Sequence, residues 1–173
     1  MSDFYKTARG WAITASERKW LYETAAIVEK QFPDPTIVNI GILYGATMHC
    51  LRAGAPSAQL FGVDIKLYPL SNKEELNATI IEGNSHTCHT EFDLGIHFLF
   101  IDGGHEYFAV KMDIAGWSPK VVVGGVIAFH DYTSTLGHVA GVKRAVDEWV
   151  ALEHTHWKRL GDMNSICAFR RIS

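Results

Sequence analysis

With 173 residues, 47% of them hydrophobic and 20% charged, the chain has the length and composition of one globular domain and is too hydrophobic for intrinsic disorder. The formal net charge of −3 and the lack of a dense Lys/Arg run disfavour nucleic acid as a partner. No apolar stretch approaches the ~20 residues of a membrane span, so we expect no membrane partner. The first residues lack the pattern of a secretory signal, and the three cysteines are odd in number. We therefore expect a cytoplasmic protein with free thiols.

Helical and strand patterns alternate along the first half of the chain. Thr14 and Glu17 have the spacing of a helix capping box, and the apolar face that follows continues to Pro33. A β-rich run then leads through a glycine turn into a helix, and three further apolar runs each end on a polar residue. The expected elements are a leading helical segment over 1–33, strands over 36–40, 60–63, 78–81 and 96–101, and a helix over 46–53.

The second half adds two helices, a strand and a hairpin. Apolar residues recur at helical spacing in two segments, and the long apolar run between these segments predicts a fully buried strand. The Gly-Asp-Met-Asn sequence near the C-terminus is typical of a turn between antiparallel strands. The expected elements are helices over 107–117 and 139–149, the buried strand over 121–129, and two strands over 156–160 and 165–171 around a turn at 161–164.

Five strand-then-helix units followed by a hairpin determine the expected fold. They imply an α/β, doubly wound, Rossmann-like sheet of seven strands, mostly parallel, with an antiparallel hairpin at its C-terminal end. We expect a single domain over 1–173, in which a leading helical segment over 1–33 precedes an α/β core over 36–173.

Polar residues follow the expected strands where these end. Asp64 follows the second strand, Asn84 the third, Asp102 the fourth, and His130 with Asp131 the fifth. The carboxyl ends of parallel strands meet at one edge of a sheet, where ligands bind. The turn after the first strand lacks the G-x-G-x-x-G pattern of a diphosphate site, whereas a carboxylate such as Asp64 can accept both hydroxyls of a ribose. The pattern therefore favours a nucleoside without phosphates.

Several ordered blocks carry a family resemblance. They are VNIG at 38–41 with GAT at 45–47, FGVDI at 61–65, IEGNS at 81–85, FIDGGHEY at 100–107 with Val110, Asp113 and Trp117, GGVIAFHDY at 124–132, and GVKRAV at 141–146. Over nearly its whole length the chain resembles the class I S-adenosylmethionine-dependent methyltransferases. Within them it is most similar to the small-molecule O-methyltransferases that include antibiotic-tailoring and sugar-tailoring enzymes.

The resemblance implies S-adenosylmethionine as the cofactor and assigns residues to it. The implied cofactor residues are Asn39, Gly41, Gly45, Thr47, Asp64, Asn84, Ser85 and Asp102. The glycines would shape the turn under the methionine part, and the Thr47 hydroxyl would face its carboxylate. Asp64 would hold the ribose, and Asn84 with Ser85 would meet the adenine. Asp102 would lie beside the methyl donor and the acceptor.

Two residues depart from the family pattern. Asn39 stands where the family commonly has a carboxylate, so a charge-assisted bond to the cofactor's amino group becomes a neutral one. Gly104 replaces the second carboxylate of the motif that close relatives carry as Ile-Asp-Gly-Asp-His, while the first carboxylate and the histidine remain.

The resemblance also implies two alternatives for the chemistry. In metal-dependent relatives, carboxylates after the fourth and fifth strands bind magnesium, and the matching positions here are Asp102, His130 and Asp131. This donor set suits magnesium or manganese, and also iron or zinc. Without a metal, His105 or His130 becomes the general base, which gives Asp102, His105 and His130 as the catalytic residues.

Simpler interpretations of these residues stay open. His105 could cap the following helix, and Asp131 could be a turn residue. A zinc site at His86, Cys88 and His89 is disfavoured because no matching distant pair accompanies it.

The function expected from the resemblance is methyl transfer to a hydroxyl of a small-molecule acceptor such as a sugar or a phenol. An N-methyltransferase of the same fold and a non-catalytic cofactor-binding protein are the alternatives. Only residues 1–15 and 133–138 are available to cover an acceptor, so its pocket is either open or completed by a second subunit in a homodimer.

Overall fold

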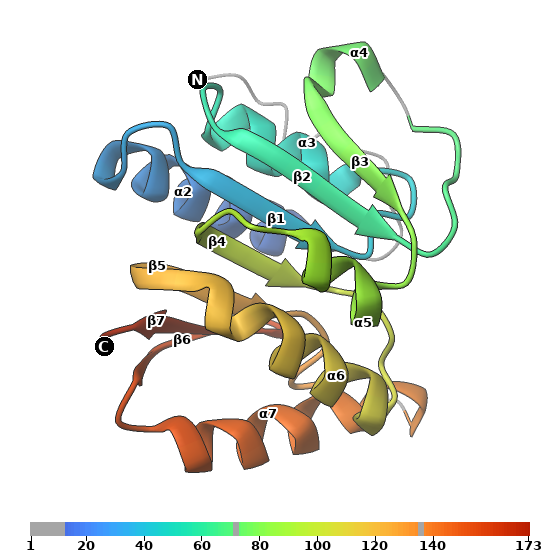
Figure 1. The fold of residues 1–173 in the computed structure, drawn as a ribbon. Coiled ribbons are helices and arrows are strands. Elements are labelled where there is room, and N and C mark those ends of the chain that lie inside the picture. Colours follow the sequence, from blue (N-terminus) through green and yellow to red (C-terminus); the bar gives the residue numbers. More distant parts are fainter. Residues whose placement is uncertain (1–12, 71–72, 135–136) are drawn as a thin grey trace.

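The computed structural model describes residues 13–70, 73–134 and 137–173, in which helices cover both faces of a β-sheet (Figure 1). The helices are α2 (Ala15–Gln31), α3 (Ala46–Gly54), α4 (Lys73–Leu76), α5 (Ser85–Cys88), α6 (Tyr107–Trp117) and α7 (Ala140–Glu153), with short 3-10 turns η1 (His89–Glu91), η2 (Ser118–Lys120) and η3 (Gly137–Val139). The strands are β1 (Thr36–Ile40), β2 (Gln59–Asp64), β3 (Ala78–Glu82), β4 (Ile96–Ile101), β5 (Val121–Phe129), β6 (Trp157–Met163) and β7 (Ile166–Arg171). Within these ranges no helix is long and apolar enough to cross a membrane.

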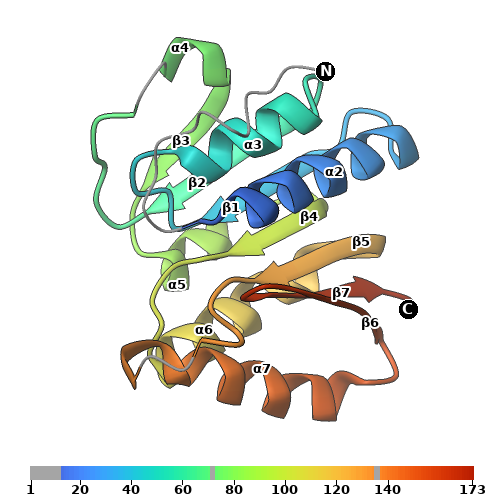
Figure 2. The same cartoon turned by 180° about the vertical axis from the view of Figure 1, so that it is seen from behind.

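The seven strands form one sheet in the order β3-β2-β1-β4-β5-β7-β6. The first five pair in parallel, and β7 pairs antiparallel with both β5 and β6. Helices α2 and α3 cover one face, and α6 and α7 cover the other (Figures 1 and 2). The predicted fold class, including the terminal hairpin, is confirmed.

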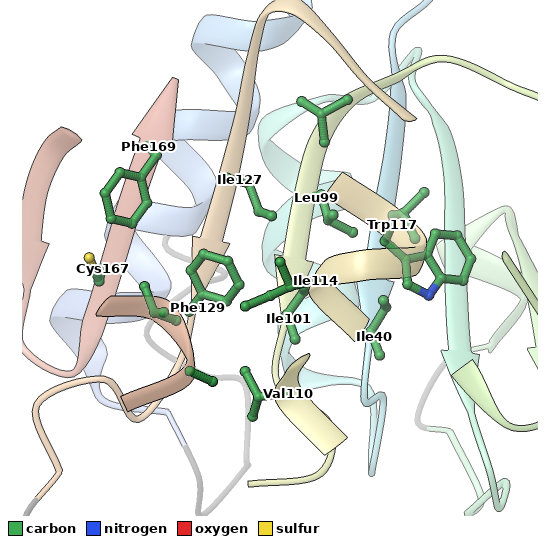
Figure 3. Close-up of a cluster of buried hydrophobic side chains, with 14 of the residues drawn as sticks. Ile40, Leu99, Ile101, Val110, Ile114, Trp117, Ile127, Phe129, Cys167 and Phe169 are labelled. Carbon is green, nitrogen blue, oxygen red and sulfur yellow. The ribbon is translucent and has the colours of Figure 1, made fainter. Parts of the chain in front are cut away.

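Strand side chains alternate between two hydrophobic clusters. In β4, Phe98 and Phe100 pack toward α2 and α3, whereas Leu99 and Ile101 pack toward α6. Figure 3 shows the second cluster, where residues of β4 and β5 meet Trp117 of α6. Because helices cover both faces of the sheet, the central strands have mostly apolar residues at consecutive positions of the sequence. The expected free thiols Cys50, Cys88 and Cys167 are all unpaired.

Strand β5 was predicted to be fully buried, but residues in its first half are partly buried or exposed. Ile96 pairs with Val121, but the next pair joins Phe98 to Val126, so four residues of β5 bulge out of the ladder. Gly124 lies in this bulge with a φ of +87°, and the side chain of Val123 is 59% exposed. The apolar residues of the run do not reveal such a bulge, but the pair Gly124 and Gly125 inside it is the local signal that could have, because glycine within a strand often marks a bulge.

The terminal hairpin turns later than predicted. Strand β6 continues through the expected turn to Met163, which pairs with Ile166, so the turn consists of Asn164 and Ser165. Gly161, with a φ of +127°, lies in an irregular part of β6, and Asn164 has a φ of +53°. Asparagine tolerates this left-handed conformation, which allows the tight turn.

Candidate active site

The turn after β1 brings the ends of three strands together. Gly41 has a φ of +85°, and its amide donates to the carbonyl of Val63 at the end of β2 over 2.8 Å. A Cβ atom on Gly41 would overlap the backbone carbonyl of Asp102 at the end of β4. Only glycine permits both the left-handed conformation and this close approach. Gly45, the N-cap of α3, shares the conformation with a φ of +87°.

A cavity of ≈ 520 Å³ lies at the carboxyl ends of β1 to β4. Of the residues predicted to bind the cofactor or to catalyse, it is lined by Gly41, Thr47, Asp64, Asn84, Ser85, Asp102 and His105. The predicted residues outside the lining are Asn39, Gly45, His130 and Asp131. The structure thus places most of the predicted residues around one cavity, although they come from five separate segments.

Asn39 lies beneath the glycine turn. Its side chain is fully buried, and its Nδ2 donates to the carbonyl of Gly41 over 2.8 Å. Its Oδ1 has no hydrogen-bond partner within the described residues. Asn39 therefore supports the turn from below, and its predicted contact with the cofactor stays a prediction.

Asp64 organises the same turn from β2. Its Oδ2 accepts from the amides of Ile42 and Leu43 over 2.7 and 3.0 Å, and its Oδ1 accepts from the amide of Lys66 over 3.1 Å. A carboxylate offers roughly four lone-pair sites, and three of them are used here. The remaining site on Oδ1 is the one available to a ligand in the cavity.

The end of β3 carries the residues expected near adenine. Asn84 is the N-cap of α5 and accepts from the amide of His86 over 3.0 Å. His86 also lines the cavity, and its Nε2 lies 3.7 Å from Oδ1 of Asp113, a fully buried carboxylate on α6. Burial raises the pKa of Asp113, although neighbouring Ser85 and histidines favour its charged form. Sequence reasoning gave neither His86 nor Asp113 a place in this site.

A cluster of acidic and histidine side chains lies at the opposite end of the cavity. Nε2 of His105 is 3.1 Å from Oδ2 of Asp131 and 3.8 Å from Oδ1 of Asp102. Nδ1 of His130 is 3.2 Å from the same Asp102 oxygen and 3.4 Å from the same Asp131 oxygen. The residues predicted from the ends of β4 and β5 are thus in contact, and His105 joins them from the loop before α6.

The side chains of this cluster shift one another's pKa values. The interactions with Asp102 and Asp131 outweigh burial and raise the pKa of His105 to about 9. Burial opposes a charge on His130, but the surrounding carboxylates outweigh it and raise the pKa of this side chain to about 12. The two histidines in turn hold the pKa of Asp131 well below its usual range. This arrangement therefore favours the charged form of both imidazoles, whose nitrogens face carboxylate oxygens without a regular hydrogen bond within the described residues.

The simpler interpretations of two residues can be compared with the geometry. The N-cap of α6 is Glu106, so His105 does not cap that helix and instead faces Asp131. Asp131 does lie in a turn, with a φ of +57° and its carbonyl accepting from the amide of Ser134 over 3.2 Å. Its side chain nevertheless points into the cluster, so Asp131 combines both properties.

The donor set fits a divalent cation. In the part of the chain that the structure describes, Asp102, His105 and Asp131 are the one group of at least three such residues whose ligating atoms converge, all within 4.8 Å of one another. The group contains His105 and not the predicted ligand His130, which is buried between Glu17 and the two aspartates. Carboxylates are ligands for magnesium and manganese, and an added imidazole also suits zinc or iron. His86, Cys88 and His89 form no such group in this part of the chain. The predicted covering segments 1–15 and 133–138 lie partly outside the described residues.

Comparisons with known proteins agree with this geometry. A family model described as a methyltransferase domain matches residues 38–132, which hold every strand end around the cavity. The chain is similar to the O-methyltransferase NovP, with a TM-score of 0.69 and 15% identity over 93% of this chain and 81% of that one. It is similar to an O-methyltransferase from Bacillus cereus in complex with SAH, with a TM-score of 0.70 and 14% identity over 99% and 92% of the two chains.

A third solved structure holds a metal ion. MycE methyltransferase from the mycinamycin biosynthetic pathway, in complex with Mg, SAH and mycinamycin VI, has a TM-score of 0.70 and 14% identity over 97% of this chain. The similar region is 52% of MycE, so this chain spans about half the length of that enzyme. At these identities the three structures demonstrate a shared fold.

Proposed function

Since this chain belongs to the methyltransferase-domain family, we propose that it transfers a methyl group from S-adenosylmethionine to a hydroxyl group of a small molecule such as a sugar or a phenol. The observation that carries the proposal is the cavity whose lining runs from Asp64 and Asn84 to Asp102 and His105. The end at Asp64 and Asn84 suits a nucleoside. The end at Asp102 and His105 suits the loss of a proton from an acceptor hydroxyl. The similarity to solved O-methyltransferases supports the choice of oxygen as the acceptor atom.

The cofactor would lie across the ends of β1 to β4. Asp64 would accept one ribose hydroxyl through Oδ1, while Oδ2 keeps the glycine turn in place. Asn84 and Ser85 would meet the adenine. Thr47, near the start of α3, would face the carboxylate of the methionine part, where helix N-terminal amides also favour an anion. The sulfonium methyl group would then lie near Asp102.

Methyl transfer from a sulfonium is an in-line displacement, so alignment of the reacting atoms supplies much of the rate. The acceptor hydroxyl must also lose its proton. In the metal-free arrangement the interactions with Asp102 and Asp131 favour a protonated His105, whose Nε2 faces Asp131 over 3.1 Å, so His105 would serve as a base only after losing this proton. Asp102, His105 and Asp131 are the residues that would hold a magnesium or manganese ion, with His130 behind them. Such an ion, when bound, acidifies and orients an acceptor hydroxyl.

The first test is a calorimetric titration of S-adenosylmethionine into chelator-treated protein, repeated with added magnesium and manganese. We expect binding in the micromolar range, and NADH is the control ligand because the turn at 41–45 lacks the diphosphate pattern. Release of S-adenosylhomocysteine in the presence of a panel of sugars, phenols and amines then identifies the acceptor class. Absence of cofactor binding under every condition would contradict the proposal.

A further inference from the structure

Glu17 is a carboxylate of α2 that is only 1% exposed. The other buried residues of this helix are Leu21, Ala25 and Val28, which form an apolar face toward the sheet. A carboxylate in such a position is costly unless polar or charged groups surround it. The groups that surround Glu17 therefore indicate what its burial achieves.

The two carboxylate oxygens of Glu17 have different partners. Oε2 accepts from the amide and the hydroxyl of Thr14 over 2.8 and 2.7 Å, which closes the predicted capping box. Oε1 accepts from the amide and the hydroxyl of Ser165, in the turn between β6 and β7, over 3.0 and 2.7 Å. The same Oε1 lies 3.7 Å from Nε2 of His130. Because the helix cap uses Oε2, the second oxygen serves the interior of the protein.

His130 is held between carboxylates on both sides of its ring. Glu17 faces Nε2, while Asp102 and Asp131 face Nδ1 over 3.2 and 3.4 Å. The side chain is 5% exposed, and the ring of Phe100 lies edge-on with its centroid 6.2 Å away. Within the described residues neither ring nitrogen forms a regular hydrogen bond, so the flanking carboxylates are the polar groups that face the ring on each side. Without the charge of Glu17, one side of the imidazole would lose its partner.

Glu17 also connects elements that carry the acceptor end of the site. The amide of Tyr132, directly after Asp131, donates to the carbonyl of Ser165 over 2.8 Å. The hydroxyl of Thr133 donates to the carbonyl of Asn164 over 2.8 Å. The segment after β5 is therefore tied to the same turn that Glu17 binds.

We propose that Glu17 is a positioning residue, which fixes the imidazole of His130 and, through it, the two carboxylates at the acceptor end of the cavity. Glu17 does not line the cavity, so it acts through His130 and not on a substrate. The consequence for turnover rests on the proposed methyltransferase function, whereas the consequence for the His130 ring does not.

The test compares Glu17→Gln with Ser165→Ala. The first variant removes the charge and nearly preserves the volume, and the second removes one hydroxyl donor to the same oxygen while keeping the charge. Thermal unfolding measures the structural cost in both. The imidazole ¹⁵N signals of His130, assigned by their absence in His130→Gln, report the ring directly without cofactor.

We expect Glu17→Gln to displace the His130 signals and to lower kcat by ~10–100-fold, as is typical when the partner of a site residue is removed, with KM for S-adenosylmethionine changed by less than ~2-fold. Ser165→Ala should destabilise the fold yet leave the His130 signals and kcat near wild type. This split between the variants distinguishes positioning from simple stabilisation.

Unmoved His130 signals in folded Glu17→Gln, or equal losses of kcat in the two variants, would overturn the proposal. If Glu17→Gln does not fold, Glu17→Asp withdraws the carboxylate by one methylene and the His130 signals decide in the same way. A wild-type protein that binds no S-adenosylmethionine would contradict the methyltransferase function alone, because the ¹⁵N comparison needs no cofactor.

Discussion

Replacing Gly41 by alanine should destabilise the protein much more than replacing Gly45 by alanine, although both glycines have nearly the same left-handed backbone, with φ values of +85° and +87°. An alanine in this conformation costs about 1–2 kcal/mol, of which about 0.4–1 kcal/mol is offset because alanine restricts the unfolded chain. A Cβ on Gly45 would meet only the flexible Cδ2 of Leu70, at 3.2 Å. We therefore expect Gly45→Ala to lose about 1 kcal/mol of unfolding free energy.

At Gly41 the same methyl group would overlap the backbone of Asp102, which cannot give way as a side chain does. Separating β1 from β4 and β2 weakens two hydrogen bonds of 2.8 Å, from the Gly41 amide to Val63 and from the Asp102 amide to Ile40. With about 0.5–1.5 kcal/mol for each bond and the loss of packing beside them, Gly41→Ala should cost about 2–3 kcal/mol more than Gly45→Ala.

Urea unfolding followed by circular dichroism measures this difference, which corresponds to roughly 5–10 °C in Tm for a domain of this size. Calorimetry on the folded fraction should also show loss of S-adenosylmethionine binding in Gly41→Ala, since this turn lines the cavity. Equal unfolding free energies for the two variants would refute the reasoning, because their backbone conformations are matched and only the overlap differs.

Three further outcomes are expected. Asp64→Asn should weaken S-adenosylmethionine binding by ~10-fold, because a charge-assisted bond becomes a neutral one. The control variant Asp93→Asn, at an exposed position, should bind the cofactor as wild type does. Calorimetry that finds binding unchanged in both variants would exclude the ribose contact. Asp131→Ala should lower turnover by at least ~100-fold and leave cofactor binding within ~2-fold, and unchanged turnover would remove this residue from the acceptor end. Burial opposes the charge of Glu17, but the contact with His130 and the hydrogen bonds from Ser165 and Thr14 outweigh it and hold its pKa below the usual range. The contribution of Glu17 to stability is therefore present above its unfolded-state pKa of about 4.3 and lost at lower pH. The unfolding free energies of wild type and Glu17→Gln should converge as the pH falls toward ~3. A difference that stays constant in acid would argue against a depressed pKa.

The order of helices and strands could be predicted because the signals are local. Period-two and buried apolar runs identified β1 to β4, and the spacing of Val110, Ile114 and Trp117 identified α6. The approximate site followed from the same information, since parallel strands present their carboxyl ends at one edge of the sheet. The polar residues after those strands therefore had to be neighbours.

Where the chain leaves regular repetition, local signals were insufficient. The bulge around Gly124 and the turn at Asn164 both depend on how one strand registers against its neighbour. A register is decided by the partner strand, so the residues of β5 or β6 alone do not specify it.

The sequence by itself determined that this is a doubly wound α/β domain with glycine, carboxylate and histidine residues at the carboxyl edge of its sheet. The tertiary structure alone decided which of these groups touch. The capping-box spacing predicted the bond between Glu17 and Thr14, but Ser165 lies 148 positions from Glu17, and no local pattern indicates that one carboxylate also faces His130. Such contacts arise when α2 packs against a folded sheet, because a buried polar atom that leaves water is stabilised by partners on segments distant in the sequence.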